Sequence, residues 1–244
     1  MSRGERNSMP EILHYPIPHT RRQLPRAAFA LHNDPLAAGR TVHYHDSKQG
    51  YAVGESVSVG ANLLIEDFPW VELGIVEAGE LSLRGDGFDL ELKAGDCFVV
   101  PRGVKVRWQH RGLLRRVFMA FPGLAPGNDM PARPVKIDLL STLQSCSPPA
   151  ASVLLTPAPQ AWSAEAFSTS NLRIGLWQCE PYARKQVEPG YSELMYILEG
   201  SVTLTSERGL ANRVKAGEVV VVPAGATNAW SSEETVRKVY CILG

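Results

Sequence analysis

Short runs of β-branched and aromatic residues alternate with turns rich in Gly, Pro and Asp from about Val57 to the end of the chain. Each run has the length of a strand, and no helical period is sustained anywhere. Many short strands at even spacing predict an all-β protein, built as a sandwich or as closed barrels. The first half contains the runs 57–65, 72–78, 80–85, 88–96, 97–101, 104–109 and 115–121, and the second half contains 172–179, 194–200, 201–207, 211–218, 219–225, 227–230 and 235–243.

The two halves repeat one another at an offset of about 121 residues. Glu72 stands seven residues before Gly79, and Glu193 stands seven before Gly200. A repeat on this scale is too long for a solenoid, so it indicates two copies of one small domain. The same correspondence relates Gly95 to Gly217, Pro101 to Pro223, Trp108 to Trp230 and Arg116 to Lys238.

The strand runs and the prolines between them predict four segments. Residues 1–45 are interrupted by five prolines and are expected to form an irregular N-terminal arm, with an edge strand as one option. The N-terminal domain follows at 46–123 and the C-terminal domain at 151–244. Residues 124–150 form a proline-rich linker, in which 136–140 is the one piece expected to be ordered.

Composition and charge narrow the possible partners. The chain of 244 residues has 25 Lys and Arg against 25 Asp and Glu, so nothing in its overall charge points to nucleic acid or to an anionic membrane. No apolar run is long enough to span a bilayer, and the first residues lack the apolar core of a secretory signal. Its four cysteines are widely spaced, and three lie in apolar strand-like runs where cysteine acts as a small buried hydrophobe. We therefore expect a cytoplasmic protein.

The second half carries the more specific motif, in the stretches ELMYILEGSVTLTS, KAGEVVVVPAGATNAW and TVRKVY. This order of strands, turns and a P-x-G step resembles the cupin superfamily. More narrowly, it is similar to the largely uncharacterised cupin family with ureidoglycine aminohydrolase-like and ethanolamine-utilisation-like members. The resemblance covers about residues 50–122 and 160–244. It implies two tandem cupin barrels of the double-stranded β-helix, or jelly-roll-like, type, and hence a bicupin. Gly79 and Gly200 are then turn residues that close a hairpin.

Cupin enzymes usually hold a divalent metal with H-x-H-x(3–4)-E and with one histidine three residues after the P-x-G glycine. In the second copy the first two histidine positions hold Gln186 and Glu188, or Val187 and Pro189 in the shorter spacing, and the last holds Asn228. In the first copy the last position holds Val106, and no histidine follows His110 anywhere. No cofactor is therefore predicted, and the alternative is a weakly held divalent metal on oxygen ligands.

The remaining histidines favour structural roles. His43 and His45 spell H-x-H, but they precede Glu72 by 27 residues or more, which favours an arm or edge-strand dipeptide. His110 shares the parity of Val106 and Trp108, so its side chain could face the first barrel. A lone histidine is more often a hydrogen-bonded structural residue than a metal ligand.

A polar and aromatic cluster is predicted inside the second barrel. Strand alternation puts Tyr191 and Glu193 on one face of a strand, and Asn228 and Trp230 on one face of another. The resemblance implies that Glu193 and Asn228 point inward, where a buried carboxylate needs a hydrogen bond, a cation or a proton. Two interpretations stay open: a site for a small polar ligand, or a Glu193 that only pairs with Lys238 or accepts from Trp230. The predicted ligand-binding residues are Trp177, Gln186, Glu188, Tyr191, Glu193, Asn228, Trp230, Lys238 and Tyr240.

The first barrel is expected to be a scaffold. Mostly apolar bulk would fill it, from Trp70, Glu72, Val104, Val106 and Trp108. Within residues 102–116 a basic stretch without any acid could attract an anionic ligand, although a solvated strand face with a dimer edge is favoured. Its members are Arg102, Lys105, Arg107, Arg111, Arg115 and Arg116.

Three functions follow from these observations. The favoured one is binding of a small polar metabolite in the C-terminal barrel without a typical histidine metal site. The second is an enzyme acting on a small nitrogenous or carboxylic metabolite, as the resemblance implies, with Glu193 as the catalytic acid or base. The third is an interaction protein. In each case we expect a homodimer formed through exposed barrel edges.

Overall fold

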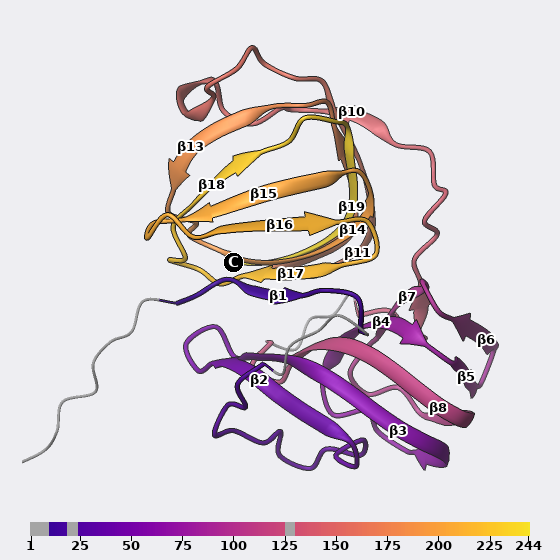
Figure 1. The fold of residues 1–244 in the computed structure, drawn as a ribbon. Helices are drawn as coiled ribbons and strands as arrows, with labels where there is room; N and C mark the ends of the chain where they lie inside the picture. Colours follow the sequence, from indigo (N-terminus) through magenta and orange to yellow (C-terminus); the bar gives the residue numbers. More distant parts are fainter. Residues whose placement is uncertain (1–9, 19–23, 125–129) are drawn as a thin grey trace, which may run out of the picture. The chain divides into compact units, whose positions relative to one another are not determined.

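A computed structural model describes residues 10–18, 24–124 and 130–244 of the chain (Figure 1). The described residues divide into two compact units. The N-terminal unit contains the described residues of 17–141 together with 165–173, and the C-terminal unit contains those of 1–16 together with 142–164 and 174–244. Nearly all regular elements are β-strands, which confirms the predicted all-β fold class with its cupin barrels.

The N-terminal unit is one bent eight-stranded sheet, because β3 and β8 are long enough to serve both layers of a barrel. Its main path runs β2-β3-β8-β4-β7-β9, and β5 branches off β8 and pairs with β6. The strands are β2 (Arg40–Asp46), β3 (Tyr51–Ile65), β4 (Val71–Ala78), β5 (Glu80–Gly85), β6 (Phe88–Lys93), β7 (Cys97–Val100), β8 (Val106–Phe121) and β9 (Val135–Lys136).

The C-terminal unit has two separate sheets. The first has the order β1-β17-β14-β19-β12-β11-β10, and the second has the order β13-β18-β15-β16. The strands are β1 (Leu13–Tyr15), β10 (Gln144–Cys146), β11 (Ala161–Ser168), β12 (Leu172–Cys179), β13 (Ala183–Val187), β14 (Ser192–Glu199), β15 (Ser201–Ser206), β16 (Ala211–Lys215), β17 (Val219–Val222), β18 (Asn228–Ser231) and β19 (Val236–Leu243).

Register pairing shows that the two units repeat one plan. Trp108 of β8 lies opposite Leu63 of β3 and Leu83 of β5. Trp230 of β18 lies opposite Arg184 of β13 and Leu204 of β15 in the same way. The turn glycines correspond as well: Gly79 and Gly200 have φ angles of 86° and 77°, and a Cβ on either would collide with a main-chain oxygen. Their predicted role in closing a hairpin is therefore confirmed.

Each unit has its own apolar core. The N-terminal core contains Trp70, Trp108 and Phe118, and the C-terminal core contains Met195, Leu204 and Trp230. The cysteines in strand-like runs, Cys97, Cys179 and Cys241, are buried as expected. Burial raises the pKa of the Cys179 thiol to about 12, which keeps it protonated and unreactive at neutral pH.

The arm and the linker supply strands that cover sheet edges. Residues 1–9 of the expected arm lie outside the described residues, but β1 pairs with β17 through Leu13 and Val221. Further along the arm, β2 pairs with β3. The linker contributes β9, which pairs with β7, and β10, which pairs with β11.

Candidate functional site

The register of β14 decides which side chains face the interior of the C-terminal barrel. Residues directly opposite one another in antiparallel strands lie on the same face of the sheet. Met195 lies opposite Tyr240 and Val220, and Ile197 lies opposite Lys238. Because Met195, Ile197 and Val220 belong to the core, Glu193 and Lys238 share that inward face.

Glu193 and Lys238 form an ion pair on this face, with 2.8 Å between Oε1 and Nζ. The side chains are 15% and 8% exposed, so the pair is largely shielded from water. The ammonium also contacts Met195 Sδ at 3.0 Å. The other carboxylate oxygen of Glu193 has no hydrogen-bond partner among the residues the structure describes. One acceptor of a mostly buried acid is thus open.

Two indole rings lie against the ammonium group, and a third aromatic ring packs on them. Lys238 Nζ lies 4.7 Å from the centroid of the Trp177 ring and 5.2 Å from that of Trp230. Trp177 and Trp230 meet nearly perpendicularly, and Tyr182 stacks on Trp230 with centroids 5.4 Å apart. A cation held over indole faces gains stabilisation in addition to its ion pair. The arrangement is an aromatic wall against the ammonium group that pairs with Glu193.

Arg184 is a polar residue of this interior that the sequence argument did not select. It lies directly opposite Trp230, so both side chains are on the same face of the sheet. Its guanidinium donates to the main-chain oxygen of Asn228 at 2.5 Å and to Asn228 Oδ1 at 2.8 Å. Arg184 forms no ion pair with any acidic side chain in the described part of the chain. It is therefore a half-buried cation without a counter-ion.

The predicted ligand-binding residues divide into two groups. The structure brings Trp177, Trp230, Lys238 and Glu193 together. Asn228 is buried on β18, the strand that also carries Trp230, and its side-chain oxygen accepts a hydrogen bond from Arg184. The other four members are more exposed or lie apart from the ion pair. Tyr240 is half-buried on the inward face opposite Met195, Tyr191 is 43% exposed, and Glu188 is exposed in the turn before β14. Gln186 is exposed and donates to the main-chain oxygens of Thr205 and Ser206.

A β-bulge explains why Gln186 was selected and Arg184 was missed. Between Arg184 and Val187 the chain advances three residues, while the opposite strand advances only two, from Trp230 to Asn228. An extra residue on one strand reverses the alternation of faces beyond it. Gln186 was selected because it holds the first histidine position of the cupin motif, and that spacing takes no account of a bulge. No sequence signal marks the bulge.

The equivalent acid of the N-terminal barrel, Glu72, is fully enclosed. It accepts from Arg40 Nη1 at 2.9 Å and Nη2 at 3.3 Å, from Trp70 Nε1 at 2.9 Å, and from Arg116 Nη1. Arg40 also pairs with Asp34 at 2.8 Å. Both oxygens of Glu72 are thus occupied, which is the main difference from Glu193.

These cations determine the charge state of Glu72. Burial alone would raise the pKa of its carboxyl, but the Arg40 and Arg116 guanidiniums outweigh it and lower the pKa to about 2. Arg116 is 1% exposed, so its assignment to a solvated strand face was wrong. The Arg116 guanidinium can be buried because Glu72 neutralises its charge and because the Trp108 ring lies 4.8 Å from the guanidinium carbon. The repeat itself carried this signal, since Arg116 corresponds to Lys238.

The three histidines considered in the sequence have structural partners or edge positions. His110 is 5% exposed, with Nε2 at 3.0 Å from Ser58 Oγ and Nδ1 at 3.2 Å from the Gly112 carbonyl oxygen. His43 and His45 lie on β2 at the edge of the sheet, where the His45 ring stacks on Phe29.

The donor set does not fit the metal that the cupin fold implies. Among the described residues, no three His, Cys, Asp or Glu side chains are grouped to hold a metal ion. The acid at the metal-ligand position, Glu193, already carries the Lys238 ammonium, and the position of the last histidine holds an Asn228 bound to Arg184. Two cations beside these oxygens would repel a third.

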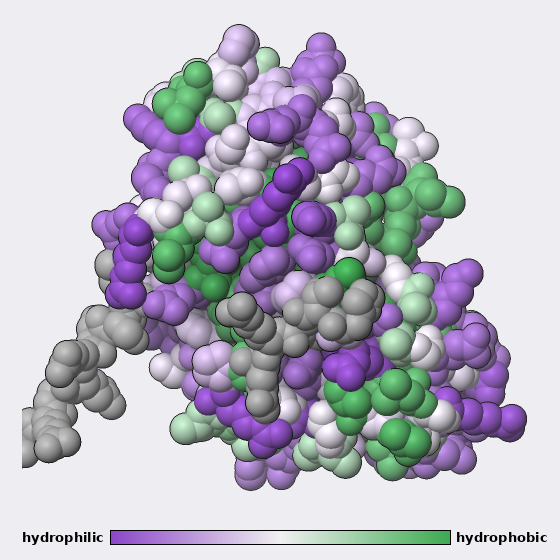
Figure 2. Space-filling model, viewed as in Figure 1, coloured by the Kyte–Doolittle hydropathy of each residue, from purple (hydrophilic) through white to green (hydrophobic). Residues whose placement is uncertain are grey.

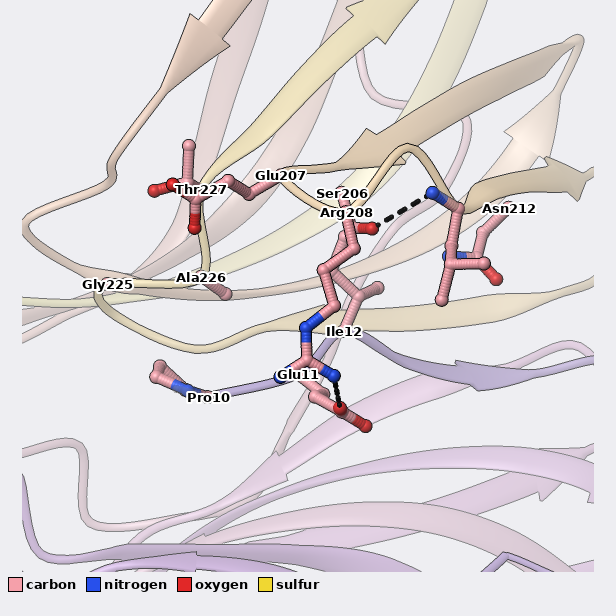
Figure 3. Close-up of a pocket in the computed structure, with 11 residues that line it drawn as sticks. Pro10, Glu11, Ile12, Ser206, Glu207, Arg208, Asn212, Gly225, Ala226 and Thr227 are labelled. Carbon is pink, nitrogen blue, oxygen red and sulfur yellow. Dashed lines mark hydrogen bonds and ion pairs between the residues drawn. The ribbon is translucent and has the colours of Figure 1, made fainter. Parts of the chain in front are cut away.

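A pocket of about 170 Å³ lies at the rim of the same barrel, beside the turn between β15 and β16 (Figure 3). Arg208 spans it to Glu11, with 3.4 Å between Nη1 and Oε1. Asn212 lies opposite the core residue Leu204, so the pocket reaches the inner face of the sheet there. None of the predicted ligand-binding residues lines it. Its lining consists of Pro10, Glu11, Ile12, Ser206, Glu207, Arg208, Leu210, Asn212, Gly225, Ala226 and Thr227.

Comparisons with known proteins agree with this architecture. Residues 168–240 match the model of the EutQ-like cupin domain. A protein of unknown function from Pseudomonas syringae pv. tomato, of the DUF861 family, is 30% identical to the chain, with a TM-score of 0.84 over 96% of this chain and 99% of that one. The chain therefore belongs to the cupin superfamily, and within it to the DUF861 family.

More distant structures show the same fold. Protein Ylba from E. coli, also of the DUF861 family, is 10% identical, with a TM-score of 0.58 over 98% of this chain and 95% of that one. A cupin 2 conserved barrel domain protein from Leptotrichia buccalis is 11% identical, with a TM-score of 0.58 over 84% and 88% of the two chains. None of the curated proteins compared with the chain matches it significantly. Within the described residues, no helix has the length and apolar character that crossing a membrane would require.

Proposed function

We propose that the C-terminal barrel binds a small polar metabolite, without a histidine-held metal, between Arg184 and Glu193. The observation that carries this proposal is the difference between the two equivalent acids. Glu72 has both oxygens occupied by Arg40, Arg116 and Trp70, whereas Glu193 keeps one oxygen open and pairs with an ammonium that lies against the Trp177 and Trp230 rings. The unbonded oxygen of Glu193 is not among the fully buried atoms that lack a partner, so it is accessible to a donor group of a ligand.

The charges of the barrel indicate the ligand class. Glu193 and Lys238 neutralise one another, and Arg184 adds one positive charge that no described acid balances. A guanidinium suits a carboxylate or a phosphate, and the open oxygen of Glu193 suits an N–H or O–H donor. The ligand is therefore a small anion that also carries an amino or hydroxyl group.

The corresponding region of the N-terminal barrel is apolar, which supports placing the ligand site in the C-terminal barrel. The row across the four-stranded sheet of the C-terminal unit reads Arg184, Trp230, Leu204 and Asn212. The corresponding row of the N-terminal unit reads Leu63, Trp108, Leu83 and Leu90. The positions of Arg184 and Asn212 are thus held by Leu63 and Leu90 in the N-terminal barrel, which was predicted to be a scaffold.

The test is a thermal-shift screen of small carboxylates and phosphates, with and without amino or hydroxyl groups, followed by titration calorimetry. We expect at least one donor-bearing anion to raise the Tm of the wild-type protein. Arg184→Gln and Glu193→Gln should each weaken its binding by about tenfold or more, because each removes a charge-assisted hydrogen bond. Lys185→Gln and Glu199→Gln are matched controls, since they change exposed neighbours on the same two strands and should bind normally. Equal binding by all four variants would place the ligand elsewhere.

Catalysis is the second candidate function. A carboxylate with one open oxygen, held 2.8 Å from an ammonium, can accept a proton from a bound molecule while the ammonium stabilises the charge that results. If Glu193 is the acid or base, Glu193→Gln should abolish turnover of the bound metabolite while leaving the fold intact. Turnover that survives in this variant would remove Glu193 from the chemistry.

A further inference from the structure

The sheet edges of the two barrels are covered by other parts of the chain in three places, two of which are equivalent. β1 covers the edge of β17, and β9 covers the edge of β7. At the outer edge of β13, Leu154 forms a bridge with Arg184, and the Leu155 N–H donates to the Ala183 oxygen at 2.8 Å. Such coverage prevents a sheet from pairing with other chains.

The edge of β3 that corresponds to β13 has no such cover among the described residues. β2 pairs with β3 only as far as Ser56, and Val57 N–H donates to the Gly39 oxygen. From Ser58 to Ile65, β3 is paired with β8 on one side, and no described strand lies on the other. The free edge of β3 is therefore Ser58–Ile65.

The composition of the free edge offers none of the usual protection. It contains no charged residue and no proline, and Val59, Leu63 and Leu64 are 77%, 39% and 47% exposed. Leu113, opposite Val59 on β8, is 47% exposed as well. Figure 2 shows apolar surface gathered over β3 and β8. By contrast, β13 is five residues long and carries Arg184 and Lys185. An exposed apolar edge of this length is expected to pair with another strand.

We infer that the free edge pairs with the same edge of a second copy of this chain, in an antiparallel arrangement about a two-fold axis. An uncharged strand can oppose its own copy without like-charge repulsion. Antiparallel pairing centred between Ala61 and Asn62 places Val59 opposite Leu64 of the second copy, so these two exposed apolar side chains cover one another and favour this register. Gly60, at the bulge in β3, leaves open space around its Cα, so no side chain obstructs the approach.

The oligomeric state tests this inference. Light scattering after size exclusion should give about twice the chain mass of 26.7 kDa for the wild-type protein. Val59→Lys and Leu64→Lys should each give the single-chain mass, because each places an ammonium group opposite an apolar side chain of the second copy, at two symmetric points of the pairing. Leu140→Lys and Leu155→Lys are matched controls, since these leucines are 91% and 69% exposed outside the edge, and both variants should remain dimeric.

Hydrogen exchange supplies an independent readout that does not depend on a variant. The amides of Ser58–Ile65 should exchange more slowly as the protein concentration rises, while those of β13 should not change. A single-chain mass for the wild-type protein at every concentration would overturn the inference. A dimer that persists in both edge variants, or that is bridged by a different protein, would overturn it too.

Discussion

Replacing Glu72 by Gln removes the one carboxylate that neutralises Arg116 inside the N-terminal barrel. Arg116 is 1% exposed and has Glu72 as its ion-pair partner, while Arg40 keeps a second pair with Asp34. Glutamine has nearly the same shape, so the change leaves the cavity filled. It loses the negative charge, and one of its two terminal groups becomes a donor that faces a guanidinium.

The expected cost follows from the burial of this cluster. Breaking a buried ion pair by removing one partner destabilises a protein by about 3–5 kcal/mol, because the remaining charge stays buried without compensation. Glu66→Gln makes the same chemical change in an exposed pair, in which Glu66 is 65% and Lys105 is 58% exposed. Its cost should be less than about 1 kcal/mol. The cost of Glu193→Gln should lie between these two values, since one oxygen of Glu193 has no hydrogen-bond partner among the described residues.

The assay is urea unfolding followed by tryptophan fluorescence and by circular dichroism, since Trp70 and Trp108 report on the N-terminal unit. Two units can unfold in two transitions, so the two probes must be compared before a free energy is extracted. A cost for Glu72→Gln within about 0.5 kcal/mol of that for Glu66→Gln would refute the reasoning, because the buried cluster would then contribute no more than a surface pair.

Three further predictions concern the same two barrels. The pKa of Glu72 falls from 4.5 to about 2 on folding, so its ionised carboxylate should contribute about 3 kcal/mol to stability above pH 4.5, and this contribution should be lost as the pH falls toward 2. Acid unfolding of the wild-type protein and of Glu72→Gln will measure this loss. An identical acid midpoint for the two proteins would contradict the prediction. Elemental analysis of tag-free protein should give less than one Mn, Fe, Ni or Zn per chain, because Lys238 occupies Glu193, and a stoichiometric metal that disappears in Glu193→Gln would overturn this. Trp230→Ala should lose about 3–5 kcal/mol of stability as a large core truncation and should also weaken ligand binding, and an unaltered affinity would move the ligand away from this wall.

Much of the fold could be predicted from local patterns. The strand runs, the turn glycines and the repeat at an offset of about 121 residues are each readable without knowing any distant contact. Alternation along β14 also predicted that Glu193 and Met195 share a face, and the repeat matched Arg116 with Lys238. Such features depend on backbone sterics and on residues close in the sequence, so one chain is enough to reveal them.

The candidate site depended on what only the tertiary structure decides. The bulge in β13 separates Arg184, on the inner face, from Gln186, which a regular strand would keep on the same face, because one extra residue breaks a period-two pattern and leaves no mark in composition. Arg40 came from the expected arm to enclose Glu72, since pairing of β2 with β3 is a long-range contact. Whether a buried acid is saturated, as Glu72 is, or keeps an open oxygen, as Glu193 does, therefore depends on partners that the repeat does not share.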